Sequence, residues 1–156
     1  MPSRREQIAM TEEEAAAFLL EEKTVTVATT GPNGRPHLMP LWYVPDGLEL
    51  SGWTFAKSQK AKNLERDPRA TLQVEAGVEY HLLRGVMIEA DVEIETDTDR
   101  VAAHGEAIFR RYATGGEPLP PEMAEMIAGQ APKRIGLRFR PTRIVSWDHR
   151  KLGGTY

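Results

Sequence analysis

Short runs of alternating residues joined by tight turns constrain the fold of this chain most. Residues 24–30 (TVTVATT) alternate with a period of two and are rich in β-branched side chains, which indicates a strand. The segment 31–34 (GPNG) is a strong turn signal, and residues 37–44 provide a returning strand. A second turn at 45–47 leads to a third strand at 48–55. The sequence therefore predicts that these three strands pair as an antiparallel meander.

The rest of the chain is predicted to add further strands and a few peripheral helices. Strands are expected at residues 70–75, 80–95, 134–140 and 143–147. Helices are expected at residues 11–22, 60–66, 96–112 and 122–129. Together these elements predict a mainly β fold with α additions (α+β), built as a small antiparallel barrel. The 156 residues suit one domain, with a helix at 11–22, a barrel with helical insertions at 23–147 and a tail at 148–156.

Pro40 falls inside the second predicted strand. Because proline has no N–H to donate to a ladder, this strand must carry a bulge at Pro40 or lie at the edge of the sheet. A bulge beside a pocket would leave backbone groups free for a ligand. The alternative is that Pro40 simply lies on an edge strand, which would imply no ligand site.

Composition and missing motifs exclude several classes of function. The chain has no cysteine, so it has no disulfide and no thiol nucleophile. Its four histidines match neither H-x3-5-H nor HExxH, and no G-x-S-x-G is present, so we expect neither a metal site nor an α/β-hydrolase. The net charge of −3 argues against nucleic acid as a partner. No apolar run approaches the ~20 residues of a membrane span, and no signal peptide is visible, so we expect a cytoplasmic protein that does not bind a membrane.

A basic segment follows the third predicted strand. Residues 57–69 (KSQKAKNLERDPR) carry five bases and two acids, a local charge of +3 on a chain whose net charge is −3. Free N–H groups at a helix start, the Ser58 hydroxyl and the ammonium groups of Lys57, Lys60 and Lys62 are the kinds of group that bind a phosphate. The sequence predicts a site for a small anionic ligand here, and a solvated lysine-rich helix is the alternative. Nearby aromatic side chains suit either a planar ligand or an ordinary core.

Three motifs beside this segment, GRPH (34–37), MPLWY (39–43) and the DG pair at 46–47, complete a resemblance. Together with residues 57–69 they resemble the split β-barrel superfamily of flavin and deazaflavin oxidoreductases. That superfamily includes pyridoxamine 5'-phosphate oxidase and the deazaflavin-dependent reductases of actinobacteria. The likeness covers about residues 12–147 and is most specific in the basic segment.

The resemblance implies a split β-barrel homodimer with two cofactor sites across the dimer interface. It implies a flavin-type ring along residues 39–41 and a phosphate on the lysines, with Asn63 capping or orienting the loop. Tyr80, His81 or an ordered water would supply a proton, and no catalytic residue is assigned. The cofactor-binding residues that we expect are His37, Met39, Pro40, Leu41, Lys57, Ser58, Lys60, Lys62, Asn63 and Tyr80.

The C-terminal end distinguishes between branches of the superfamily. Pyridoxamine 5'-phosphate oxidase itself ends in a basic segment that binds the substrate phosphate, and residues 146–156 do not match that segment. The KAKN form at 60–63 looks more like the branch that uses coenzyme F-420, a deazaflavin. We therefore expect an F-420-dependent oxidoreductase that transfers hydride to an unsaturated small molecule. The alternatives are an FMN-dependent enzyme of the oxidase type and a non-enzymatic carrier of the cofactor.

The tail carries more functional groups than a passive terminus needs, namely Trp147, His149, Arg150 and Tyr156. We expect it to close part of the active site, that of the partner subunit in particular, and a frayed end is the alternative.

Overall fold

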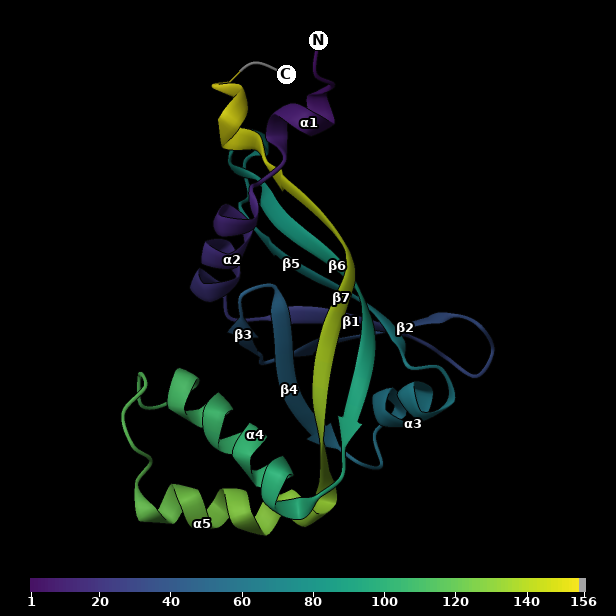
Figure 1. Cartoon of the computed structure of the whole chain (residues 1–156), viewed down its shortest axis with the longest axis vertical. Helices are drawn as coiled ribbons and strands as arrows, with labels where there is room; N and C mark the ends of the chain where they lie inside the picture. The colour runs from purple at the N-terminus through teal and green to yellow at the C-terminus, as the bar shows by residue number, and fades with distance from the viewer. Residues whose placement is uncertain (155–156) are drawn as a thin grey trace.

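Seven strands form one antiparallel sheet in the computed structural model, which describes residues 1–154 (Figure 1). The strands are β1 (Val25–Thr30), β2 (Pro36–Leu41), β3 (Val44–Asp46), β4 (Glu49–Phe55), β5 (Arg69–Ala76), β6 (Arg84–Glu95) and β7 (Arg134–Asp148). The helices are α1 (Arg4–Ile8), α2 (Glu12–Glu21), α3 (Gln59–Arg66), α4 (Thr98–Tyr112) and α5 (Pro121–Gln130). Short 3-10 turns are η1 (Tyr80–Leu82), η2 (Ala131–Lys133) and η3 (His149–Leu152). The strand order is β2-β1-β5-β6-β7-β4-β3, and every neighbouring pair is antiparallel.

The sheet curls until its two edges approach each other. Strands β2 and β3 lie at opposite edges, although only Trp42 and Tyr43 separate them in the chain. A Cβ placed on Gly52 of β4 would lie 3.0 Å from Leu41 Cδ2 and 3.1 Å from the carbonyl oxygen of Trp42. Glycine at this position therefore permits the close approach of β4 to the end of β2. This curled, incompletely closed sheet confirms the split-barrel prediction.

The predicted meander is wrong because residues 37–44 do not form one strand. Strand β2 pairs only with β1, and β3 pairs only with β4. The break falls at Tyr43, whose ring is fully buried and whose hydroxyl donates to the carbonyl oxygen of Leu19 at 2.6 Å. Burying this side chain against α2 turns the chain from one edge of the sheet to the other. The edge position of β2 also accounts for Pro40, which needs no ladder partner on its outer side.

Two further strand boundaries differ from the prediction. Residues 80–82 form the turn η1, and β6 begins only at Arg84. The two strands expected at 134–140 and 143–147 are one strand, β7, which continues through Pro141. Glu89 pairs with Arg143 and Ala90 with Pro141, so the intervening residue bulges out of the ladder and accommodates the proline.

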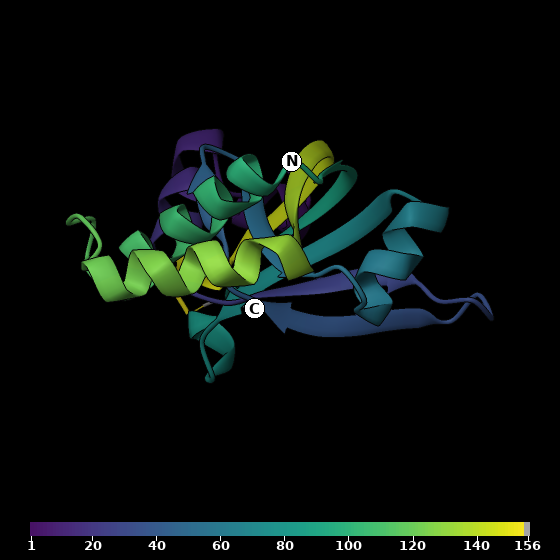
Figure 2. The ribbon, with the colours of Figure 1, turned by 90° about the horizontal axis from the view of Figure 1, so that it is seen from below.

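The core lies in two parts. The larger part fills the concave side of the sheet, where α2 contributes Ala15, Phe18 and Leu19. The smaller part lies between β4 and the helix pair, around Trp53 and Ile108. Figure 2 shows α4 and α5 side by side at one side of the sheet, with α3 and the β1–β2 hairpin on the opposite side. Within residues 1–154, no helix combines the length and the apolar character needed to cross a membrane.

Candidate cofactor site

The basic segment forms the start of α3, immediately after β4. Ser58 caps the helix, because its Oγ accepts a hydrogen bond from the N–H of Ala61 at 3.1 Å. The cap does not use the Ser58 hydroxyl proton, which can therefore be donated to a ligand. Lys57 and Lys62 are exposed, and Lys60 is buried. The junction therefore presents a hydroxyl, helix N–H groups and three ammonium groups.

Lys60 is the unusual member of this group. Its side chain is only 6% exposed, and burial lowers its pKa. Across residues 1–154 its ammonium group forms no ion pair and no hydrogen bond, and Nζ is not among the fully buried unpaired atoms, so it keeps some contact with water. A cation that is largely removed from water without a counter-charge is costly. The environment of Lys60 therefore suits an anion that the chain itself does not supply.

Asn63 ties α3 to β1. Its side chain is fully buried, and its Nδ2 donates to Thr29 Oγ1 at 3.1 Å. Its Oδ1 accepts from Gln59 Nε2 at 2.8 Å. Because the Asn63 side chain uses both its amide nitrogen and its oxygen in these hydrogen bonds, it orients the helix and has few hydrogen-bonding positions left for a ligand. The resemblance implies that Asn63 caps or orients the loop, and these hydrogen bonds hold α3 against β1.

His37 lies beside this network on β2. It pairs with Thr29 across the β1–β2 ladder, so the two side chains lie on the same face. Its Nδ1 is buried and is the single side-chain nitrogen or oxygen within residues 1–154 that is buried without a hydrogen-bond partner. Leaving a buried polar atom unpaired costs about 1–3 kcal/mol. The site thus contains a buried unpaired nitrogen of His37 on β2 and the largely buried Lys60 on α3.

Pro40 and Leu41 line a pocket of about 300 Å³ at the other end of β2, where α4 and α5 cover β4. Met39 precedes them and is half exposed. Strand β2 therefore connects the two features expected of the site, since it runs from His37 near α3 to the pocket at Leu41.

Tyr80 does not join this cluster within one chain. It lies in η1, and the eight-residue strand β5 separates it from α3 (Figure 1). Its ring packs edge-on against His149, with ring centroids 4.7 Å apart, and its carbonyl oxygen lies 2.8 Å from His149 Nδ1. His81 lies in the same turn. A contact between Tyr80 and the lysines therefore requires a second copy of the chain.

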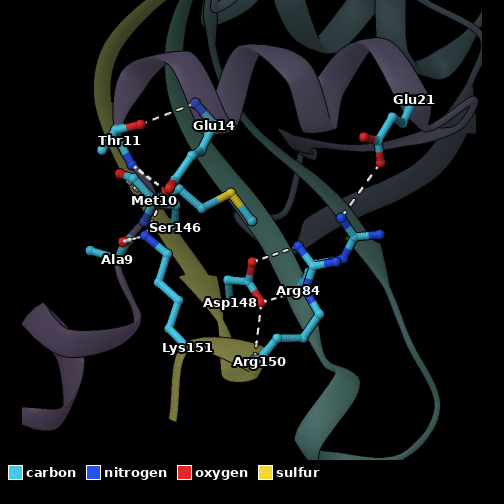
Figure 3. Close-up of polar contacts among 10 residues, drawn as sticks. All are labelled: Ala9, Met10, Thr11, Glu14, Glu21, Arg84, Ser146, Asp148, Arg150 and Lys151. Atoms are coloured by element: carbon cyan, nitrogen blue, oxygen red, sulfur yellow. Dashed lines mark hydrogen bonds and ion pairs between the residues drawn. The ribbon is translucent and has the colours of Figure 1, made fainter. Parts of the chain in front are cut away.

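The C-terminal segment is clasped to the N-terminal helices (Figure 3). Lys151 Nζ donates to the carbonyl oxygen of Ala9 at 2.9 Å and to Glu14 at 2.6 Å. Two hydrogen bonds from the Arg150 guanidinium hold the Asp148 carboxylate and lower its pKa. The segment up to residue 154 therefore lies against α1, away from α3 of its own chain. Its expected contact with a partner's site stays a prediction, and Tyr156 lies outside the described residues.

Sequence reasoning missed Lys133 and Arg134. The pairing of β4 with β7 places Arg134 opposite Phe55, and the N–H of Ala56 donates to the carbonyl oxygen of Lys133 at 2.9 Å. Two more basic residues thus flank the start of α3. In the sequence, Arg134 belongs to an alternating strand with one basic face, and no local signal distinguishes it from Arg138 or Arg140.

No group of histidine or acidic side chains within residues 1–154 is arranged to hold a metal ion.

Comparisons with known proteins agree with this fold. The family model described as "Pyridoxamine 5'-phosphate oxidase" matches residues 11–148. The crystal structure of the conserved hypothetical protein Rv2991 from Mycobacterium tuberculosis is similar, with 42% identity, coverage of 99% of this chain and 95% of that chain, and a TM-score of 0.87. A structure named F420 Reductase has 23% identity, covers 92% of this chain and 98% of its own, and has a TM-score of 0.61. A FAD-binding protein from Mesorhizobium loti has 15% identity, coverage of 88% and 94%, and a TM-score of 0.66. The last two show the fold alone, and no curated protein matches the chain significantly.

Proposed function

We propose that this chain, which belongs to the pyridoxamine 5'-phosphate oxidase family, binds coenzyme F-420 and reduces an unsaturated small molecule by hydride transfer. The family binds flavins and related cofactors and includes oxidoreductases. The choice of the deazaflavin is our proposal and is supported by the KAKN form of residues 60–63. The observation that carries the proposal is the buried Lys60, which has no counter-charge within residues 1–154 and lies at the start of α3.

The residues of the junction fit the phosphate of such a cofactor. Lys60 would neutralise the phosphate with its positive charge, and Ser58 would donate its hydroxyl proton to a phosphate oxygen. Lys57 and Lys62 are exposed and would add to the positive field without being desolvated. A charge-assisted hydrogen bond contributes about 1.5–3 kcal/mol, so Lys60 is the strongest single contributor that we expect.

The residues of β2 fit the ring of the cofactor. Pro40 and Leu41 would provide an apolar surface, and Met39 would lie beside them. The unpaired Nδ1 of His37 would bind a polar atom of the cofactor, as a donor or as an acceptor depending on its tautomer. When bound, the deazaflavin supplies the hydride, and the protein supplies position and electrostatics.

We further propose that the protein is a homodimer. Large apolar side chains are exposed at both ends of the sheet, namely Leu38 and Met39 near the site, and Val78, Tyr80 and Leu82 around η1. A second copy that covered both groups would bury this surface. It would also bring the η1 turn and the tail of one subunit toward the site of the other, where Tyr80 or His81 could hold a proton.

FMN is the alternative cofactor, because a phosphate and a flat ring would meet the same residues. The FMN enzyme of the pyridoxamine-phosphate-oxidase type and a non-enzymatic carrier therefore remain the competing proposals. Turnover against a panel of enones distinguishes an enzyme from a carrier, because a carrier binds the reduced cofactor without oxidising it.

Titration of the cofactor-free protein with F-420 and with FMN tests the proposal. We expect saturable binding with F-420 preferred, and a loss of at least tenfold in affinity in Lys60→Glu, since about 1.4 kcal/mol corresponds to one decade. Lys23→Glu is the matched control, because Lys23 is exposed and lies between α2 and β1. Equal affinities of the wild type and Lys60→Glu for both cofactors at low salt would remove Lys60 from the site.

A further inference from the structure

The pocket at the end of β2 has the size and the opening of a site for a small ligand. Its volume of about 300 Å³ lies at the lower end of the range for small-molecule pockets, which suits one or two rings. Trp42 and Met126 line it and are 49% and 42% exposed, so it opens to solvent and is not a gap in the core. Its lining residues are Pro40, Leu41, Trp42, Trp53, Ile108, Phe109, Met126, Gln130 and Arg134.

The aromatic walls of this pocket are held in fixed orientations. The ring of Trp42 stacks on that of Tyr112, with centroids 4.4 Å apart and planes 10° apart. Phe109 packs edge-on against both Trp42 and Trp53, at 6.3 Å and 6.5 Å. Rings that pack on one another in this way form rigid aromatic walls, and aromatic walls favour a planar ligand.

Arg134 gives the pocket its charge. Its guanidinium lies over the rings of Phe55 at 3.9 Å and Trp53 at 4.5 Å, and its Nε donates to Gln130 Oε1 at 3.1 Å. Within residues 1–154 it has no carboxylate partner, and no acidic residue lines the pocket. The two terminal nitrogens are therefore available to a ligand, and a guanidinium held in one plane is suited to bind a carboxylate through both oxygens.

We propose that this pocket binds a planar organic acid of one or two rings, with its ring against Trp42 and Phe109 and its carboxylate on Arg134. Pro40 and Leu41 belong both to this pocket and to the surface proposed for the cofactor ring, so a ligand here lies next to that ring. That the bound acid is the hydride acceptor rests on the proposed function. Binding of the acid itself does not, because every residue used here belongs to the cofactor-free protein.

Calorimetric titration of the cofactor-free protein with three probes of the same shape tests the proposal. The probes are cinnamate, cinnamyl alcohol and cinnamylamine, which are anionic, neutral and cationic at pH 7. We expect cinnamate to bind at least tenfold more tightly than the alcohol, and the amine to bind more weakly than either. Equal binding of the three probes, or no binding of cinnamate, would overturn the proposal.

Substitutions in the pocket test whether cinnamate binds there. Arg134→Met should remove the preference for cinnamate over the alcohol, and Met126→Trp should weaken the binding of both by filling the pocket. Arg138→Met is the matched control, since Arg138 lies on the same strand, is exposed and pairs with Glu49. If Arg134→Met does not fold, Arg134→Lys keeps the charge but loses the two-point contact and should reduce cinnamate affinity several-fold. Unchanged selectivity in a folded Arg134 variant would refute the assignment.

Cofactor titrations on the same samples separate this proposal from the proposed function. Met126→Trp should bind F-420 with nearly the affinity of the wild type, because Met126 lies on α5 and the proposed phosphate contacts lie on α3. Selective cinnamate binding in a protein that binds neither F-420 nor FMN would retain the acid site and remove its role as the substrate pocket. Cofactor binding without cinnamate binding would overturn the acid site and leave the proposed function in place.

Discussion

Replacing Lys60 with methionine should stabilise the cofactor-free protein and weaken its cofactor binding at the same time. Lys60 is 6% exposed and has no counter-charge within residues 1–154, so folding removes most of this charged side chain from water without an ion pair in return. Methionine keeps most of the aliphatic stem and carries no charge. We expect a gain of about 1 kcal/mol in the free energy of unfolding at pH 7, which is about 2–4 °C in Tm for a chain of this size. The affinity for F-420 should fall at least tenfold, through the loss of one charge-assisted hydrogen bond.

The pH dependence of this gain follows from the lowered pKa of Lys60. Burial places the pKa of the folded state below the ordinary value near ~10.4, so between the two values the unfolded chain binds more protons. Stability of the wild type therefore rises with pH across this window, and the advantage of Lys60→Met should be full at pH 7 and smaller near pH 10. Urea unfolding of both proteins at the two pH values measures this difference. Lys62→Met is the control for stability, because Lys62 is exposed on the same helix and should change nothing. A Lys60→Met protein that is less stable than the wild type at pH 7 and binds F-420 equally well would refute the reasoning.

Three further predictions concern the stability of the fold and the oligomeric state. Arg111 donates to the carbonyl oxygens of Leu19, Leu20 and Glu22 at the end of α2, so Arg111→Met should lower the free energy of unfolding by about 3 kcal/mol in a denaturant titration. Deleting residues 149–156 removes the clasp and leaves the buried Asp148 unpaired. The deletion should lower thermal stability at neutral pH. Hydrogen bonds from Arg150 lower the pKa of Asp148, so the stabilisation from this pair is lost when Asp148 becomes protonated. The difference in Tm between the deletion variant and the wild type should therefore shrink as the pH falls below about 4. Sedimentation at micromolar concentration should give a dimer, and a monomer that still binds cofactor would contradict the proposed assembly.

Local signals in the sequence were sufficient for the elements with strong patterns. The alternation of residues 24–30 and the glycine turn after them define β1 and its hairpin with β2. The capping box at Thr11 and Glu14 begins α2 as expected, and Pro40 lies on an edge strand. Each of these features depends on neighbouring residues or on backbone chemistry, which is the reason that they can be predicted without the fold.

The failures share a long-range cause. The break between β2 and β3 depends on the burial of Tyr43 against α2, and no pattern within residues 37–44 shows this. The single strand β7 persists through Pro141 because β6 accommodates a bulge there. In both places contacts between distant segments override the local preference for a continuous strand or for a turn.

The sequence by itself determined the family, the antiparallel sheet and the place of the lysines proposed to bind an anion, because these follow from local alternation and from one dense motif. Only the tertiary structure decided which lysine is buried, since the burial of Lys60 depends on how α3 packs against β1. It also brought Arg134 to the end of β2 through the β4–β7 ladder, and it separated Tyr80 from the lysines by the length of β5. These outcomes depend on which strands become neighbours in the curled sheet, and that pairing is set by the burial of the whole core and not by any single segment.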